Sequence, residues 1–316
     1  MKKYVVGVDL GGTKIAVASS DLDGNVIYEN TIATNASEGE SAILNRIITL
    51  IDEVIKKSKI KTEDIVCIGI GSPGPLDSEK GVIITTPNLP FKNFQIVNPI
   101  REKFNIPVVL DNDANVAALG EHRFGAGRGT SNMIFITVST GIGAGAILNG
   151  KLYRGNTGNA LEIGHVTLKE DGPKCNCGNY GCAEVMCSGT AIARQGKEAV
   201  HKNMETSLKK YENITAKDVF NEAELGDSVA SSIIDESLNF LGIFVANVLN
   251  CFDPEVVVIG GGVSKAGKIV FDKINEVASK RSFKHIYDNA KILPAELGTD
   301  AGIKGALALA ISSIVE

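Results

Sequence analysis

Three cysteines within eight residues form the strongest chemical pattern in the sequence. Cys175, Cys177 and Cys182 follow a Cys-x-Cys-x4-Cys spacing, and His165 stands ten residues upstream of the first. Three thiols and one imidazole supply the four sulfur and nitrogen ligands that close a tetrahedral zinc site. A reduced cysteine-rich loop is the alternative, but the spacing favours zinc. Because protein ligands would fill all four positions, such a zinc would be structural and would fix the surrounding loop.

Glycine-rich turns occur at three places, each after an apolar stretch that predicts a strand. Glycine lets the backbone approach an anion and leaves amide donors free, so such turns can hold phosphate oxygens. Any single turn could be an ordinary hairpin, but three in one chain favour a nucleotide site. The residues expected there are Asp9, Gly11, Gly12, Thr13, Lys14, Thr140, Gly141, Gly261 and Gly262.

The three turns match neither of two common nucleotide loops. The sequence lacks a Gly-x-Gly-x-x-Gly motif with an acid at a strand end about 20 residues later, and it lacks a Walker A loop ending in Gly-Lys-Ser/Thr. Asp9 ends a predicted strand, where a carboxylate is suited to hold Mg2+ through water. We therefore expect ATP and Mg2+ between two lobes, with the adenosine near the third turn.

Strand and helix patterns alternate along the chain, which indicates an α/β fold. The first third predicts one helix at residues 42–57 and strands at residues 4–9, 15–19, 26–33 and 65–70. A second unit predicts one helix at residues 114–124 and strands at residues 107–110, 133–139 and 144–148. Both units place a glycine turn between two apolar strands, so one lobe is interpreted as a distant copy of the other.

The remaining segments predict a more helical second half. Prolines fill residues 73–99, which we expect to be largely loop or short hairpin. Later patterns predict a buried strand at residues 255–259 and helices at residues 191–201, 216–222 and 228–250. The apolar, alanine-rich segment at residues 300–314 is expected to pack back on the first lobe.

Composition excludes several classes of protein. The 316 residues carry a net charge of −5 without a basic stripe, which argues against a nucleic-acid partner. No apolar run reaches the roughly 18 residues of a membrane span, and the N-terminal residues lead directly into a strand pattern instead of a signal peptide. We therefore expect a cytoplasmic protein without a membrane partner. Cys67 and Cys251 lie in apolar segments and are interpreted as small core residues.

The order of the three turns resembles the fold of actin, hexokinase and the heat-shock chaperones. Glu162-Ile-Gly-His165, followed by the cysteine pattern and Ala183-Glu184, is similar to the ROK family of bacterial sugar kinases and repressors, and the resemblance extends from Asp9 to Gly302. It implies two actin-like, ribonuclease H-like lobes around a central cleft for ATP and sugar. The small lobe would comprise residues 1–112 with 301–316, and the large lobe residues 113–300, with a zinc-binding loop at residues 165–184.

The resemblance implies roles for two residues of the Asp111-Asn112-Asp113 segment. Asp113 would be the catalytic base and Asn112 a sugar ligand, although for Asp111 or Asp113 alone an ordinary helix N-cap stays open. The other implied sugar ligands are Glu162, His165 and Glu184, with Asn88 and Gly74 as weaker candidates.

The same resemblance implies ATP-dependent phosphorylation of glucose at the 6-hydroxyl by a homodimer or homotetramer. Mannose, N-acetylmannosamine, fructose or allose as substrate, and polyphosphate as donor, stay open. Leu161 and Ser139 replace smaller residues of the family and leave the preferred sugar open. A repressor would need a DNA-binding segment ahead of Asp9, where eight residues stand, and a chaperone-like ATPase would need neither Asp113 nor the zinc and acid cluster.

Overall fold

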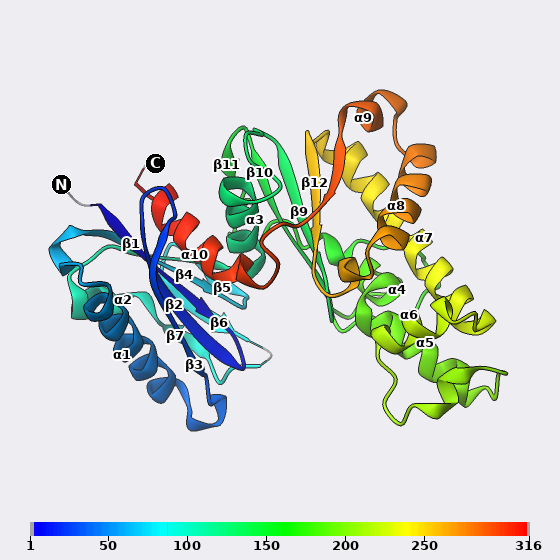
Figure 1. The fold of residues 1–316 in the computed structure, drawn as a ribbon, viewed down its shortest axis with the longest axis horizontal. Coiled ribbons are helices and arrows are strands. Elements are labelled where there is room, and N and C mark those ends of the chain that lie inside the picture. Colours follow the sequence, from blue (N-terminus) through cyan, green and yellow to red (C-terminus); the bar gives the residue numbers. More distant parts are fainter. Residues whose placement is uncertain (1–2, 87, 315–316) are drawn as a thin grey trace.

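The computed structural model describes residues 3–86 and 88–314, which form two lobes side by side (Figure 1). The first lobe is built on a five-stranded sheet in the order β3-β2-β1-β4-β8. Its first three strands pair antiparallel, and β4 and β8 continue the sheet parallel to β1. The strands are β1 (Tyr4–Leu10), β2 (Lys14–Asp21), β3 (Val26–Ala33), β4 (Ile65–Ser72) and β8 (Val108–Asn112).

A second five-stranded sheet repeats this arrangement in the order β11-β10-β9-β12-β13. Three strands again pair antiparallel, and two follow in parallel on the other side of the central strand. The strands are β9 (Met133–Val138), β10 (Ile142–Leu148), β11 (Lys151–Leu152), β12 (Val256–Gly260) and β13 (Lys291–Pro294). The same order and the same strand directions confirm the prediction that one lobe copies the other.

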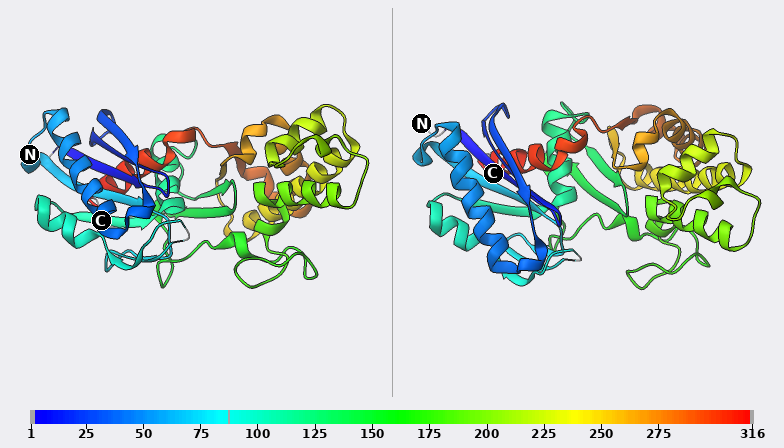
Figure 2. Two further views of the ribbon diagram at one scale, coloured as in Figure 1. Left: turned by 90° about the horizontal axis from the view of Figure 1, so that it is seen from below. Right: turned by 60° about the horizontal axis from the view of Figure 1, so that its bottom comes forward.

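Helices α1 (Glu40–Ser58) and α2 (Val97–Phe104) cover the outer face of the first sheet (Figures 1 and 2). Helix α1 buries apolar side chains that recur every three or four residues, among them Ile43, Ile47 and Val54. This spacing puts them on one side of the helix, where they pack against buried strand residues such as Val8 and Ile70. The apolar residues whose spacing predicted this helix are therefore the ones that form the core of the lobe.

Helices α3 (Asp113–Phe124) and α10 (Ala301–Ser312) lie between the two sheets (Figure 1). They pack against each other at Gly120 and Gly305, where an added Cβ would meet the backbone of the other helix. Helix α10 also packs on β1 and β4, with Gly69 giving it room. The expectation that the C-terminal segment returns to the first lobe is confirmed, whereas the exact lobe boundaries stay a prediction.

The remaining helices form the outer part of the second lobe (Figures 1 and 2). They are α4 (Ala183–Cys187), α5 (Gly189–His201), α6 (Ala216–Glu224), α7 (Ser228–Phe252), α8 (Lys268–Arg281) and α9 (Lys284–Asn289). Contrary to the expectation from the sequence, α7 is long and apolar enough to span a membrane by length and composition. Most of it is buried inside the protein, which is the usual state of a core helix.

Among the further expectations, some are confirmed and others need correction. The proline-rich segment is largely loop with short hairpins, as expected, and its strands β5 (Leu76–Asp77), β6 (Val82–Thr85) and β7 (Lys92–Gln95) form a small antiparallel sheet. A 3-10 turn at Val263–Ala266 separates the third glycine turn from α8. Cys67 is buried as expected, but Cys251 is exposed because it lies on the outer side of α7.

Candidate active site and metal cluster

Asn112 and Asp113 stand where β8 ends and α3 begins. Asn112 is the N-cap residue, because its Oδ1 accepts a hydrogen bond from the backbone N–H of Ala114 at 2.9 Å. Asp113 is the first helical residue, and its Oδ1 accepts from the same N–H at 2.8 Å. The capping role that the sequence left open for Asp111 or Asp113 therefore belongs mainly to Asn112.

The pKa of the Asp113 carboxyl group is higher than usual for an aspartate. Solvent reaches this side chain, but the surrounding protein removes enough water that desolvation raises its pKa to about 6. The negative charges of Asp9 and Glu162 raise the pKa further, and the hydrogen bond from Ala114 opposes them. A carboxyl group with a pKa near neutrality can accept and release a proton at physiological pH.

Asp9 lies at the end of β1, against the first turn of α10. Burial raises its pKa, and the charge of Lys14 acts in the opposite direction. A Cβ at position 302 would overlap the Asp9 carboxylate, so a larger residue there would displace that carboxylate. In the β1–β2 turn itself, Gly12 packs against Asn88, where an added Cβ would lie 3.0 Å from the Asn88 Cβ.

Asp111 anchors the segment behind Asn112. Its side chain is buried, and its Oδ2 accepts a hydrogen bond from Arg154 Nε at 2.7 Å. Its Oδ1 accepts from the Asn112 backbone N–H at 2.8 Å and from Asn115 Nδ2 at 2.9 Å. This ion pair, which we did not foresee from the sequence, joins β8 to the segment after β11. Gly74 lies nearby, and an added Cβ there would stand only 3.1 Å from the Asn112 side-chain amide nitrogen, closer than an ordinary contact.

The second glycine turn, between β9 and β10, is held by Glu184 from α4. Glu184 Oε2 accepts a hydrogen bond from the backbone N–H of Ile142 at 3.1 Å. A Cβ at Gly141 would overlap the same carboxylate, so the close approach depends on glycine. At Ser139 the backbone carbonyl accepts from the N–H of Gly189, the first residue of α5, at 2.7 Å.

The third glycine turn packs directly on the second. Gly261 has a φ of 90°, a left-handed conformation that favours glycine, and a Cβ there would overlap the Val138 carbonyl. A Cβ at Gly262 would lie 3.8 Å from the Ser139 hydroxyl oxygen. The second and third turns therefore form one surface together with the start of α5.

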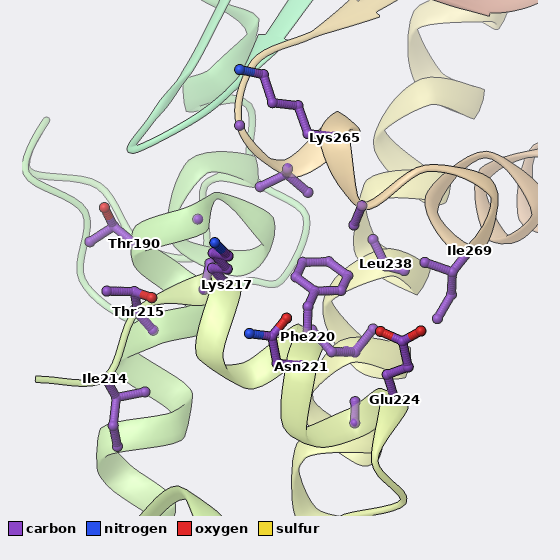
Figure 3. A pocket seen from close by; sticks show the side chains of 18 of the residues that line it. Thr190, Ile214, Thr215, Lys217, Phe220, Asn221, Glu224, Leu238, Lys265 and Ile269 are labelled. Atoms are coloured by element: carbon purple, nitrogen blue, oxygen red, sulfur yellow. The ribbon is translucent and has the colours of Figure 1, made fainter. Parts of the chain in front are cut away.

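A large cavity of ≈1540 Å3 opens beside Thr140 and Gly262 (Figure 3). Phe220 lies at its centre, with Leu238 and Ile269 on one side and Lys217 and Asn221 on the other. Sequence reasoning missed these residues, although Lys217 and Asn221 stand four apart on the predicted helix at residues 216–222 and so share one face.

His165 and the three cysteines of the predicted metal site lie together. Their ligand atoms all lie within 4.8 Å of one another. Cys175 Sγ is 3.5 Å from His165 Nδ1, and Cys177 Sγ is 3.7 Å from Cys182 Sγ. Ligands at about 2.0–2.3 Å from a tetrahedral zinc stand roughly 3.3–3.8 Å apart, so the cluster fits such an ion.

Glu162 joins the metal cluster to the rest of the site. It directly precedes a 3-10 turn at Ile163–His165, so one short turn carries both Glu162 and His165. Leu161, the residue before it, has a φ of 68° and a buried side chain. A glycine adopts this left-handed backbone more readily, and nothing in the structure explains the leucine at this position.

The structure thus brings the proposed site residues into three groups. The first unites Asp9, near the end of β1, with Asp113 and Glu162. The second unites the other two turns with Glu184, and the third is the histidine and cysteine cluster. Thr13 and Lys14 are exposed to solvent, and in the described part of the chain no hydrogen bond or ion pair links them to the β9–β10 turn.

Comparison with known proteins identifies the family. The model of the ROK family matches residues 5–313. A glucokinase of Halalkalibacterium halodurans is 39% identical over 96% of this chain and 93% of its own. A xylose repressor of Caldicellulosiruptor bescii is 36% identical over 98% of this chain and 79% of its own.

A solved structure gives the same result. The ROK family glucokinase of Streptomyces griseus, in complex with glucose and AMPPNP, aligns with a TM-score of 0.76 and 33% identity over 98% of this chain and 99% of its own. The two repeated sheets therefore form the actin-like ATPase fold found in ROK hexokinases. With a family model covering nearly the whole length and relatives matching almost all of it, this chain belongs to the ROK family.

Proposed function

We propose that this protein is an ATP-dependent hexose kinase that phosphorylates the 6-hydroxyl group, with glucose as the preferred sugar. The observation that carries this proposal is Asp113, a carboxyl group at the start of α3 whose pKa is raised to about 6 by burial and by the charges of Asp9 and Glu162. Such a group suits a general base for a sugar hydroxyl. The glucokinase of H. halodurans and the glucose complex of S. griseus glucokinase support the sugar.

In the proposed reaction Asp113 accepts the proton of the 6-hydroxyl as that oxygen attacks the γ-phosphorus. A bond forms between the sugar oxygen and phosphorus, the bond to the bridging β,γ-oxygen breaks, and ADP leaves. Asn112, whose side-chain amide faces Gly74, would orient the sugar. The remaining hydroxyl groups of the sugar would bind to Glu162, His165 and Glu184. Further contacts to the sugar would come from Asn88 and Gly74.

The nucleotide would lie along the second and third turns. The mainly apolar cavity around Phe220 suits a purine ring, and its rim carries Lys217 and Asn221 for polar contacts. Free amides near Gly141 and Gly262, together with Thr140, would hold phosphate oxygens. From the other lobe, Gly11, Gly12, Thr13 and Lys14 would approach the terminal phosphate.

Asp9 would hold the magnesium ion of MgATP. Burial and the nearby charge of Asp113 both disfavour two bare carboxylates at this point, so a cation fits the charge of the site. Bound there, Mg2+ would neutralise charge on the phosphates.

We further propose that His165, Cys175, Cys177 and Cys182 hold a structural zinc ion. The supporting observation is the spacing of their ligand atoms, all within 4.8 Å. A zinc in this place would fix the turn that carries Glu162 and His165 and the start of α4 that carries Glu184. The purified chain is expected to contain one zinc ion, measured by elemental analysis.

Matched cysteine variants sharpen this zinc test. Cys177→Ser should lose the zinc and raise the KM for the sugar, because the sugar ligands would no longer be fixed. Cys251→Ser, which changes an exposed cysteine outside the cluster, should keep both. Zinc content near zero in a fully active preparation would contradict the proposal.

The kinase proposal is tested by measuring ADP release with ATP across hexoses and N-acetylhexosamines. Release that depends on a hexose, with the largest kcat/KM for glucose, is the expected outcome. Hydrolysis without sugar would indicate a chaperone-like ATPase. Sugar binding without turnover, together with binding to operator DNA, would indicate a repressor like the C. bescii relative.

A further inference from the structure

A second cavity, of ≈690 Å3, lies between the lobes and away from the proposed nucleotide cavity. One wall comes from the first lobe, namely the β5–β6 turn and α2. The opposite wall comes from β11 and residues 150–158 of the second lobe. The walls approach closely, since a Cβ at Gly158 would lie 3.7 Å from the Ser78 hydroxyl oxygen. Its volume lies within the range of about 300–1,000 Å3 that is usual for small-molecule sites.

Cations line both walls of this cavity. Lys80 and Arg101 belong to the first lobe, and Lys151 and Arg154 to the second. Lys80 pairs with Asp77 at 2.8 Å, and Arg154 pairs with the buried Asp111 at 2.7 Å.

Two of these cations remain available to a ligand. Arg101 donates a hydrogen bond to Asn98 Oδ1 at 2.5 Å, and neither Arg101 nor Lys151 is within ion-pair distance of a carboxylate in the part of the chain that the structure describes. Two positive charges without an acidic partner, one from each lobe, attract an anion into the cavity that they line.

We propose that this interlobe cavity binds a sugar phosphate and that this binding alters sugar affinity at the proposed active site, so the second part rests on the kinase proposal. Arg101 and Lys151 would hold the phosphate group from the two sides. The cavity also presents groups that suit sugar hydroxyls, which are Asn98, Asn156 and the acids Asp77 and Glu79. Bare phosphate would leave these groups unused.

The path from this cavity to Asp113 consists of hydrogen bonds. Arg154 lines the cavity and donates to Asp111, whose other oxygen accepts from the backbone N–H of Asn112. Asn112 caps the helix that begins with Asp113. Because the ligand would touch both lobes and Arg154, it would favour one arrangement of the lobes over others.

The test measures binding of glucose 6-phosphate to the full chain by calorimetry, without ATP. Arg101→Ala combined with Lys151→Ala should raise the dissociation constant at least about tenfold, as expected for loss of two charge-assisted contacts. Arg281→Ala, which removes an exposed arginine on α8 outside this cavity, is the matched control and should leave it unchanged. The affinity should also fall with rising salt, because ions screen the attraction.

Two comparisons locate the bound molecule. Loss of all binding in Glu162→Gln, with no effect of the double variant, would place glucose 6-phosphate in the sugar site and overturn the proposal. Inorganic phosphate that binds as tightly as glucose 6-phosphate would overturn the sugar part of it. Because these measurements need no turnover, they separate this proposal from the kinase proposal.

A kinetic measurement tests the coupling. In the Arg101→Ala, Lys151→Ala double variant, glucose 6-phosphate can change the KM for the sugar only by competing for the sugar site. In the wild-type enzyme it should change this KM by more. The double variant should keep the wild-type kcat without added ligand. Equal effects of glucose 6-phosphate on both enzymes would overturn the coupling.

Discussion

The β1–β2 turn and the β9–β10 turn occupy the same place in two sheets of equal topology, yet they present different groups. The first turn follows Asp9, a carboxylate pressed against Gly302 of α10. The second follows Val138 and carries the hydroxyls of Ser139 and Thr140, with Glu184 bonded to its backbone. Duplication therefore repeats the backbone, while the elements packed against each turn decide its chemistry.

The two lobes divide the proposed chemistry: the carboxyl groups of Asp9 and Asp113 stand at or directly after strand ends of the first sheet, and the nucleotide cavity belongs to the second lobe. Asp9 lies near the end of first-lobe strand β1 and Asp113 directly follows first-lobe strand β8, and desolvation raises the pKa of each. The cavity with Lys217, Phe220 and Asn221 lies wholly in the second lobe. Variants matched across the two lobes can break or sharpen this division.

The largest effect is expected from Asp113→Asn, which removes the proposed base. We expect kcat to fall by about 10²–10⁴, the usual contribution of a general base, while the sugar still binds. Steady-state kinetics and a separate sugar-binding measurement check this, with Asp52→Asn, a half-exposed aspartate of α1 that pairs with Lys56, as control. Turnover near the wild-type value would remove Asp113 from the mechanism.

The stability of Asp113→Asn shows whether that variant is folded. Because the pKa in the folded protein lies above the ordinary value of 3.8, this group favours folding below about pH 4. That contribution is lost as the pH rises through about 6. At pH 7.5 the variant should therefore melt at or above the wild-type temperature in calorimetry.

A smaller effect is expected from adding one methyl group beside each turn. Gly302→Ala should displace the Asp9 carboxylate and lower kcat/KM for MgATP by roughly 10–100-fold, with little change in the KM for the sugar. Gly141→Ala should displace Glu184 and raise the KM for both substrates. Measuring kcat/KM for MgATP and the KM for the sugar in both variants checks this division between the lobes. The same change of both constants in the two variants would contradict it.

The smallest effect is a shift in the pH profile. Since the reaction needs the deprotonated form of Asp113, kcat/KM should fall as the pH drops through about 6. Glu162→Gln removes a negative charge that raises this pKa, so the acidic limb of the profile should move to lower pH. This shift is expected even if the variant also lowers the maximum kcat/KM. Glu170→Gln, an exposed acid, should leave the limb in place. An unmoved limb in Glu162→Gln would show that the two groups do not interact.

Local patterns predicted most of the secondary structure. The strand at residues 26–33 is found with the predicted bounds, and the helix at residues 42–57 is two residues longer at its start and one at its end. Periodicity succeeds here because one face of each element meets a core. In the proline-rich segment it gave no strand bounds, because β5, β6 and β7 are very short and pair with one another in a small sheet separate from the main sheet of the lobe.

The sequence by itself determined the glycine turns, the histidine and cysteine spacing and the Asp111-Asn112-Asp113 segment. These features lie within short stretches of chain, where residue type and spacing carry the chemistry. They also indicated the ROK family, which the comparisons show.

Only the tertiary structure decided which distant groups meet. Gly302 and Asp9 are almost 300 residues apart, and the ion pair of Arg154 with Asp111 and the contact of Glu184 with Gly141 also join separate segments. The raised pKa of Asp113 arises from burial and from charges supplied by distant parts of the chain. Burial and electrostatic interactions depend on position in space, so no local pattern could have given them.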